Sequence, residues 1–529
     1  YKRQVNKLAL ASGKQVFRLS EKLTLKPGET KTVRQSARID NPILWSTDAP
    51  YLYNLASMIK RGGKTTDEIT TPFGIRTLTW PCKNPSGDHR FFLNGKPTFI
   101  NGVCEYEHQL GQSHAFSSEQ IAARIKEVRQ MGFNAFREAH QPHNLEYQKL
   151  LDREGILFWS QFTAHIWYDS PQFRSEFKRL LRQWIKERRN SPSIMLWGLQ
   201  NESVLPADFA RECCDIIREM DPTARTMRAI TTCNGGEGTD WNVIQNWSGT
   251  YGGSAKNYDK ELRQPVQLLN GEYGAWRTIG LHSEAKDLEK EKAYSEEKFT
   301  GILETKMLLA ESAKDSVCGH FQWIMNSHDN PGRTQPDEGL RMIDKIGPFN
   351  HKGLTTVWEQ PTDAYQMYRA HHTCPDTDPM VYIVSHTWSN RFKETGSRRT
   401  DINVYSNCDS VLLYNDATDN EFLGRKKVTP NTPHSTPSTH LVWENRLIKY
   451  NVLRAVGYRN GKPAAEDIII YSGLPQAPHF DALYSGSTIV PTPADRNADL
   501  LRGAEGYNYV YRINCGGNAM TDEYGQQWT

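Results

Sequence analysis

The sequence predicts a multidomain protein in which a (β/α)8 TIM barrel is flanked by immunoglobulin-like β-sandwiches, so that α/β and all-β parts share one chain. Three observations predict this fold class. The 529 residues suffice for about three domains. Residues 90–370 alternate short apolar runs with longer amphipathic stretches, which is typical of α/β folds. The flanking residues alternate apolar and polar positions between turn residues, as half-buried strands do.

Residues 1–78 are expected to form an immunoglobulin-like sandwich that lacks a strand at its start. Alternating apolar and polar residues predict strands over 15–21 and 22–26, before the turn pair Pro27-Gly28. The glycines between Arg61 and Lys64 predict the tip of a hairpin. The length is close to that of a small sandwich domain.

Residues 79–372 are expected to form the barrel. A hairpin over 91–100 enters it, and Ser117 or Ser118 is the predicted N-cap of a first helix over 118–131. A second helix is predicted over 173–188. Eight strands within about 220 residues suit a closed barrel better than a six-stranded open sheet. These strands are predicted near residues 100–103, 135–137, 156–160, 194–199, 228–231, 243–247, 267–270 and 319–323.

The chain returns to β-structure after the barrel. Residues 373–475 are expected to form a second immunoglobulin-like sandwich, and residues 476–529 a linker followed by the start of a truncated domain. The predicted strands of this sandwich are 381–384, 402–405, 411–414, 448–454 and 468–471.

Composition excludes several classes of function. Lys and Arg (64) nearly balance Asp and Glu (61), and the densest basic run, 182–189, reads as a solvated helix face rather than a nucleic-acid site. The longest apolar runs fall far short of the ~20 residues of a membrane span. The nine cysteines include no CxxC pair, so they are expected to be mostly free thiols. The sequence predicts a soluble protein that binds neither nucleic acid nor membrane.

Two carboxyl groups are the strongest candidates for catalysis. Glu202 follows the fourth predicted strand and Glu272 follows the seventh, and active sites of such barrels lie at the carboxyl ends of the strands. Two carboxyls facing each other there suit glycoside hydrolysis, one as acid and one as nucleophile. The alternative is that each acid only pairs with a nearby Arg or Lys. The adjacent Asn201, which can hydrogen-bond a sugar hydroxyl, favours the catalytic interpretation.

The motifs around these acids resemble glycoside hydrolase family 2, which includes β-galactosidases, β-glucuronidases and β-mannosidases. Trp197-Gly-Leu-Gln-Asn-Glu202 resembles its acid/base segment, and Glu272-Tyr-Gly274 its nucleophile segment. Further similar segments lie at Asn41-Pro-Ile-Leu-Trp45, Pro50-Tyr-Leu-Tyr53, Phe73-Gly-Ile-Arg76, Leu93-Asn-Gly-Lys-Pro97, Asn101-Gly-Val103 and Gly132-Phe-Asn-Ala-Phe-Arg137 with His140-Gln-Pro-His143. The resemblance spans residues 41 to about 370, in family order.

The resemblance implies a retaining mechanism with Glu272 as nucleophile and Glu202 as general acid, then base. The two carboxyls are then expected about 5–5.5 Å apart. Arg137 corresponds to an arginine that supports the nucleophile, and Tyr251 is the candidate for a tyrosine that hydrogen-bonds it. The other residues expected to contact sugar are Asn201, His140, Trp323, Glu107 and His108.

The sequence also departs from the family. Trp159-Ser-Gln161 stands where an Asp-Glu pair is common, and the Mg²⁺ ligands of some members have no clear counterpart apart from His165, so neither a metal nor a cofactor is expected. Both ends look cut, and the family's N-terminal jelly-roll domain is missing. Residues 513–517 and 524–528 resemble the opening of a malectin-like domain. Layouts of this kind are typical of bacterial polysaccharide degraders, which implies work on algal or plant glycans in the periplasm or outside the cell.

The identity of the substrate sugar is the feature that the sequence constrains least. The leading expectation is an exo-β-galactosidase that removes terminal β-galactosyl residues. The alternative is a β-glucuronidase, because Asn350-His-Lys352 resembles a motif that holds a uronate carboxylate. A third reading is an inactive carbohydrate-binding or scaffolding module, which a carboxyl separation above ~10 Å would favour. Balanced charge and exposed sheet edges permit a homodimer without requiring one.

Overall fold

The computed structural model describes residues 2–9, 14–84, 86–110, 114–163, 165–166, 168–203, 205–282, 294–329, 349–392, 399–429, 438–483, 511–513, 519–521 and 525–529. Two compact units divide the chain. The first comprises residues 1–380, 405–409 and 428–441, and the second comprises 381–404, 410–427 and 442–529. Of the predicted malectin-like segments, residues 514–517 and 524 lie outside the described residues.

The first described residues form one four-stranded antiparallel sheet in the order β2-β1-β3-β4. The predicted hairpin tip is present, because Gly62 and Gly63 both adopt positive φ between β3 and β4, where a side chain would be strained. The strands are β1 (Lys2–Ala9), β2 (Gln15–Leu23), β3 (Tyr53–Arg61) and β4 (Lys64–Phe73).

Side chains just before β3 and just after β4 contact the base of the barrel. The indole N–H of buried Trp45 donates to the carbonyl of Asp152 (2.8 Å). Arg76 donates to the carbonyls of Pro192 (2.9 Å) and Ile194 (2.9 Å). Arg76 therefore caps the entry of the fourth barrel strand, and Trp45 contacts the segment that leads into the third.

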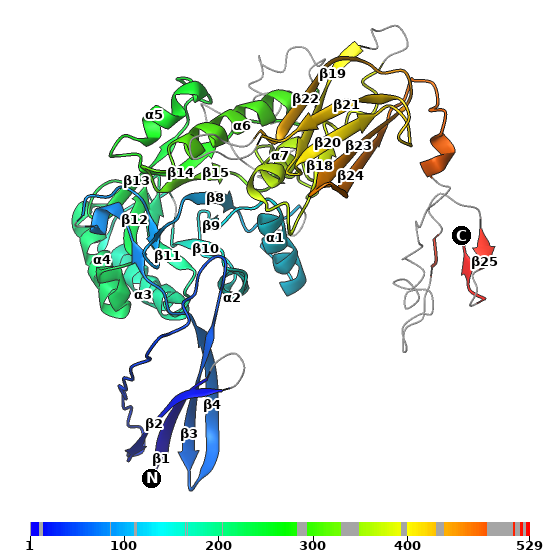
Figure 1. Cartoon of the computed structure of the whole chain (residues 1–529). Helices are drawn as coiled ribbons and strands as arrows, with labels where there is room; N and C mark the ends of the chain where they lie inside the picture. Colours follow the sequence, from blue (N-terminus) through cyan, green and yellow to red (C-terminus); the bar gives the residue numbers. More distant parts are fainter. Residues whose placement is uncertain are drawn as a thin grey trace. The chain divides into compact units, whose positions relative to one another are not determined.

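The centre of the first unit is a closed barrel of eight parallel strands in the order β8 to β15 around the ring (Figure 1). All eight predicted strands are present, and the predicted fold class is confirmed. Their residues are mostly buried, as expected where both faces of a parallel sheet are covered. The strands are β8 (Ile100–Glu105), β9 (Ala135–Glu138), β10 (Leu157–Gln161), β11 (Ile194–Asn201), β12 (Ala229–Cys233), β13 (Trp241–Asn246), β14 (Leu269–Gly274) and β15 (Gly319–Trp323).

Helices cover the outside of the barrel (Figure 1). The first begins at the predicted N-cap: the Ser117 hydroxyl accepts from the Gln120 amide, and the Gln120 side chain accepts from the Ser117 amide, a capping box. The helices are α1 (Ser118–Gln130), α2 (Leu145–Glu154), α3 (Pro171–Arg188), α4 (Ala207–Met220), α5 (Tyr258–Leu262), α6 (Glu296–Ser312) and α7 (Asp363–His372). None of the helices in the described part of the chain is long and apolar enough to cross a membrane.

Short elements precede and follow the barrel strands. The predicted hairpin at the entry is present as β6 (Phe92–Leu93) and β7 (Lys96–Pro97), which pair with β5 (Leu78–Thr79). Beyond β15, β16 (His328–Asp329) pairs with β17 (Phe349–Asn350).

The later residues form two antiparallel sheets, β18-β19-β22 and β21-β20-β23-β24. The predicted strand 448–454 is wrong in its first half, because β22 ends at Leu447 and β23 begins at Val452. The amides of Lys449 and Tyr450 donate to the Asn415 side chain instead of a neighbouring strand. The strands are β18 (Val381–Ile383), β19 (Arg399–Ser406), β20 (Ser410–Tyr414), β21 (Phe422–Lys427), β22 (His440–Leu447), β23 (Val452–Arg459) and β24 (Lys462–Ile470).

Candidate active site

Glu202 and Glu272 lie at the same end of the barrel. Glu202 follows β11 directly, and Glu272 lies in the second half of β14. The pKa of Glu272 is raised to about 8, mainly by burial; the charge of Arg137 opposes this rise, and the negative charge of Glu202 adds to it. The two carboxyls are therefore close enough to interact electrostatically.

Glu202 lies at a sharp turn of the chain. Its φ is +43°, an uncommon conformation for a residue with a side chain. Its amide donates to the carbonyl of Cys233 at the end of β12 (2.8 Å), which holds this turn. The side chain is 40% exposed, and Oε2 lies 3.9 Å from Nδ1 of His165. Glu202 is therefore a carboxyl open to solvent and to a substrate in the barrel mouth.

Glu272 is instead buried, with its side chain 3% exposed. Nη1 of Arg137 donates to Oε1 of Glu272 (2.7 Å), and Nε2 of His140 lies 3.7 Å from the same oxygen. The amide of Glu272 donates to the side chain of Asn270 (2.9 Å). These contacts fix the carboxyl in one orientation, and the ion pair with Arg137 favours its charged form against burial.

Arg137, on β9, connects the two halves of the site. Nη2 donates to Oδ1 of Asn201 (2.7 Å), the residue before Glu202. Nε and Nη2 both donate to Oε1 of Gln161 (3.1 and 2.8 Å), and the guanidinium lies over the ring of Trp159. Gln161 is the residue that stands where the family often has an acid, and its role was not predicted. Its position at the end of β10 is the sequence signal that could have identified this role.

Asn201 has a donor left for a ligand. Its Oδ1 accepts from Arg137 and from Nε2 of Gln245 (3.3 Å), which orients the amide with Nδ2 on the other side. Within the described residues, that buried Nδ2 has no hydrogen-bond partner. A buried donor without a partner is costly, and a sugar hydroxyl would satisfy it.

His140 and Trp323 line the site beside Glu272. Their rings stack at 4.9 Å and 10°, and Tyr106 packs edge-on against both. Burial and the charge of Arg137 hold the pKa of His140 well below its usual range. His140 is thus a neutral imidazole that can donate or accept a hydrogen bond.

Lys352 lies close enough to Glu272 to act on its charge and is not a solvent-exposed loop lysine. Its side chain belongs to a residue only 3% exposed, and its positive charge lowers the pKa of Glu272. Nζ lies 3.5 Å from the hydroxyl of Tyr251, which is half exposed. Oδ1 of Asn350, on β17, is buried without a hydrogen-bond partner among the described residues. The buried Lys352 thus lies near Glu272, and contact of Asn350 with a substrate stays a prediction.

Glu107 and His108 brace loops at the barrel mouth. Glu107 accepts from the amide of Asn144, the N-cap of α2 (2.9 Å), and burial raises the pKa of Glu107. His108 forms an ion-pair contact with Asp329 of β16, and its carbonyl accepts from the side chain of Asn326 (3.1 Å). Contact of Glu107 and His108 with sugar stays a prediction.

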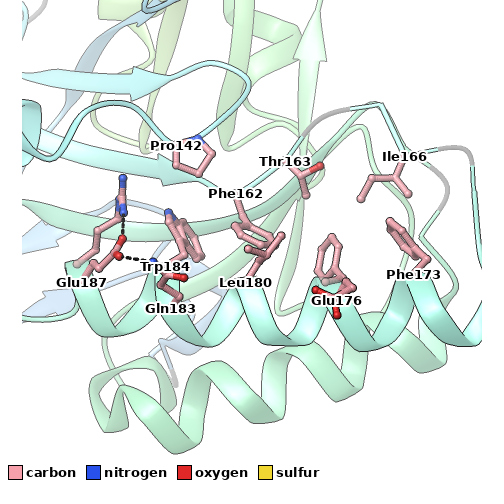
Figure 2. A pocket seen from close by; sticks show the side chains of 12 residues that line it. Pro142, Phe162, Thr163, Ile166, Phe173, Glu176, Leu180, Gln183, Trp184 and Glu187 are labelled. Carbon is pink, nitrogen blue, oxygen red and sulfur yellow. Dashed lines mark hydrogen bonds and ion pairs between the residues drawn. The ribbon is translucent and has the colours of Figure 1, made fainter. Parts of the chain in front are cut away.

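A separate pocket of about 510 Å³ lies along α3 (Figure 2). Its walls are mainly aromatic and aliphatic, and none of the candidate site residues lines it. Because Phe162 follows Gln161 at the end of β10, its ring faces the helix while Gln161 faces the barrel interior. The lining residues are Pro142, Phe162, Thr163, Ile166, Phe173, Glu176, Phe177, Leu180, Gln183, Trp184, Glu187 and Arg188.

Comparison with known proteins gives the family. Residues 87–304 match "Glycosyl hydrolases family 2, TIM barrel domain", residues 5–76 match "Glycosyl hydrolases family 2", and residues 397–465 match a domain of unknown function. The first two matches together cover more than half of the chain. They include Glu202, Glu272 and Arg137.

Named relatives carry two activities. A putative β-glucuronidase of Formosa agariphila is 29% identical over 408 residues, which cover 71% of this chain and 48% of that protein. A β-galactosidase of Thermoanaerobacter pseudethanolicus is 22% identical over 458 residues, covering 84% and 57%. The chain thus spans about half the length of these relatives.

A solved structure has the same fold. The β-glucuronidase of Parabacteroides merdae superposes with a TM-score of 0.74 at 23% identity, covering 90% of this chain and 60% of that one. The barrel, the arrangement of Glu202, Glu272, Asn201 and Arg137, and the matches along the chain lead to one conclusion. The chain belongs to glycoside hydrolase family 2.

Proposed function

We propose that this glycoside hydrolase retains configuration at the anomeric carbon, with Glu272 as nucleophile and Glu202 as acid and base. In the first step an oxygen of Glu272 bonds to the anomeric carbon, the bond to the leaving oxygen breaks, and Glu202 donates a proton to that oxygen. In the second step Glu202 takes a proton from water, whose oxygen displaces Glu272. The buried, Arg137-paired carboxyl suits the nucleophile, and the exposed one suits proton exchange.

We propose further that the substrate is a β-glucuronide, the alternative named above, rather than the β-galactoside first expected. The observation that carries this is the burial of Lys352 beside Glu272. A uronate presents a carboxylate that can form a charge-assisted hydrogen bond with an ammonium. A galactoside presents a neutral hydroxymethyl group there, which would leave Lys352 without a counter-charge from the sugar. The relatives named as β-glucuronidases support the same choice.

A panel of aryl β-glycosides tests this specificity. We expect the glucuronide to be hydrolysed with the highest kcat/KM among glucuronide, galactoside, glucoside, mannoside and fucoside. If the galactoside is preferred, the proposal is wrong and the first expectation stands. If none is cleaved and the protein only retains a glycan, the chain is a binding module.

The Lys352→Met substitution is expected to lower kcat/KM for the aryl glucuronide by about 10²–10⁴-fold, because an ion pair removed from a buried site costs about 3–5 kcal/mol. The residual activity on a neutral glycoside should fall far less. Lys126→Met, which changes an exposed lysine of α1, is the matched control. An equal loss on charged and neutral sugars would mean that Lys352 acts only through Glu272 and does not bind the carboxylate of the sugar.

The pH dependence of kcat/KM should report the ionisation of Glu272. A protonated carboxyl cannot attack, so the rate on an aryl glycoside that needs no proton should rise with pH and reach half its maximum near pH 8, where the pKa of Glu272 is raised by burial. Since the charge of Lys352 lowers that pKa, Lys352→Met should move this limb to higher pH. A shift to lower pH, measured with the same substrate, would contradict the assignment.

Other expectations stay predictions that can be tested separately. They are the domain boundaries after residues 78, 372 and 475, the carboxyl separation of about 5–5.5 Å, the periplasmic or secreted location, the polysaccharide context and the homodimer. Sedimentation of the purified protein tests the homodimer that the sequence permits without requiring, since a dimer would sediment at about twice the 60.5 kDa chain mass.

A further inference from the structure

Lys306 is a buried lysine that the proposed mechanism does not use. It lies on α6, outside the barrel wall, and is 0% exposed. Burial lowers its pKa to about 7, so this position holds an ammonium at a cost in solvation that an apolar side chain would avoid. A lysine that is shielded from water in this way is expected to make a specific stabilising interaction.

Lys306 forms hydrogen bonds with Asn246, the last residue of β13. Nζ donates to the backbone carbonyl of Asn246 (3.0 Å) and to its Oδ1 (2.9 Å). The ammonium also lies 4.3 Å from the ring centre of Tyr258, with Tyr273 and Trp276 near it. These rings favour a cation and leave it little freedom to move. The ammonium therefore fixes both the backbone and the side chain of Asn246.

Asn246 in turn starts the loop 247–252. Its Oδ1 accepts from the amide (3.1 Å) and the hydroxyl (2.7 Å) of Ser248, while Nδ2 donates to Glu261 (2.7 Å) and Gln267 (2.8 Å). All polar atoms of this side chain are thus used, and the loop direction depends on the orientation of the amide.

The same loop is attached to the strand that carries the candidate nucleophile. Nε1 of Trp276 donates to the carbonyl of Gly249 (2.9 Å), and the hydroxyl of Thr250 donates to the carbonyl of Gly274 (2.5 Å). Tyr251 follows Thr250, and its hydroxyl faces Lys352 at 3.5 Å. The contacts of Gly249 and Thr250 thereby hold Tyr251, which is half exposed, in a defined position.

We propose that Lys306 is a positioning residue, which acts through Asn246 to hold the loop 247–252 and place Tyr251 against Lys352 for substrate binding. The part that concerns substrate rests on the proposed uronate specificity. The part that concerns the loop does not. Lys306 itself touches neither Glu202 nor Glu272 in any contact described above, so its effect should fall on KM more than on kcat.

Hydrogen exchange of the intact protein tests the loop directly. In Lys306→Met, which keeps the length of the side chain and removes its donors, the amides of Gly249, Thr250 and Tyr251 should exchange at least tenfold faster, while peptides from β11 keep wild-type rates. Lys314→Met, at an exposed position just after α6, should leave the loop unchanged. Wild-type exchange in the loop, or equal acceleration throughout the barrel, would overturn the proposal.

Kinetics separate this proposal from the proposed function. In Lys306→Met, KM for the aryl glucuronide should rise at least fivefold with kcat within twofold, and the rise should be smaller in a Tyr251→Phe background. If the wild-type protein cleaves no glucuronide, the specificity is wrong but the exchange rates still decide whether Lys306 holds the loop. Should Lys306→Met fail to fold, Asn246→Ala removes the Oδ1 atom to which both Lys306 and Ser248 donate, and unchanged loop exchange there would overturn the proposal.

Discussion

Replacing Glu272 by alanine is expected to lower kcat by at least about 10⁴-fold on every substrate, because no other group can form the bond to the anomeric carbon. The loss should be the same for activated and poor leaving groups. Steady-state hydrolysis of two aryl glucuronides, with leaving groups of different acidity, measures it. Glu272→Gln, which preserves the shape of the side chain, should lose activity to a similar extent.

Rescue by a small anion separates loss of the nucleophile from loss of the fold. Azide can enter the space left in Glu272→Ala, where Arg137 would attract it, and attack from the same face. The product is then an α-glycosyl azide, of configuration opposite to the substrate. A β-glycosyl azide from this variant, or a Glu272→Ala protein with more than a few per cent of wild-type activity, would contradict the assignment of the nucleophile.

Replacing Glu202 by alanine is expected to have an effect that depends on the leaving group. For an alkyl or sugar aglycone, which must be protonated, kcat/KM should fall by about 10²–10⁴-fold. For a strongly acidic phenol, which leaves without a proton, kcat/KM should fall far less. A plot of log kcat/KM against the pKa of the leaving group should therefore be steeper for the variant than for the wild-type protein.

The exposed carboxyl also allows a matched control for this variant. His165 lies 3.9 Å from Glu202, so His165→Ala should perturb the surroundings of the acid without removing it. The steep dependence on leaving group should appear in Glu202→Ala and not in His165→Ala. An equal loss on both kinds of substrate in Glu202→Ala would mean that Glu202 is not the acid.

The barrel could be predicted because its strands are buried on both faces and separated by amphipathic helices. Both signals are local in the sequence. The later sheets were harder, because β21 (Phe422–Lys427) and the second half of β22 (His440–Leu447) carry exposed polar or charged residues. Their pairing depends on partners distant in the chain. The strand expected over 448–454 is wrong in its first half because the backbone amides between residues 448 and 451 donate to the side chain of Asn415. Residues 448 and 451 are uncharged, so the sequence around them gives no sign of this contact.

The site could be predicted as far as residue types and strand ends allow. Arg137, Asn201 and Glu272 are joined by hydrogen bonds in the structure, as their shared place at the barrel mouth suggests. Which atoms form these hydrogen bonds depends on side-chain packing, so the spacing of the residues in the sequence could not predict them. Gln161 was treated as a departure from the family, yet it orients Arg137. Lys306 lies between apolar residues of a helix, where a sequence offers no sign that Asn246 is its partner.

One measurement tests the central claim most directly: covalent trapping with an activated 2-deoxy-2-fluoro-β-glucuronide, followed by mass spectrometry of the intact protein and of its peptides. The fluorine slows the second step, so the glycosyl-enzyme should accumulate. We expect one fluoroglucuronyl group per chain, attached to Glu272, and none in Glu272→Ala. A label on another residue, or turnover that inverts the anomeric configuration without any label, would contradict a retaining β-glucuronidase built on Glu272.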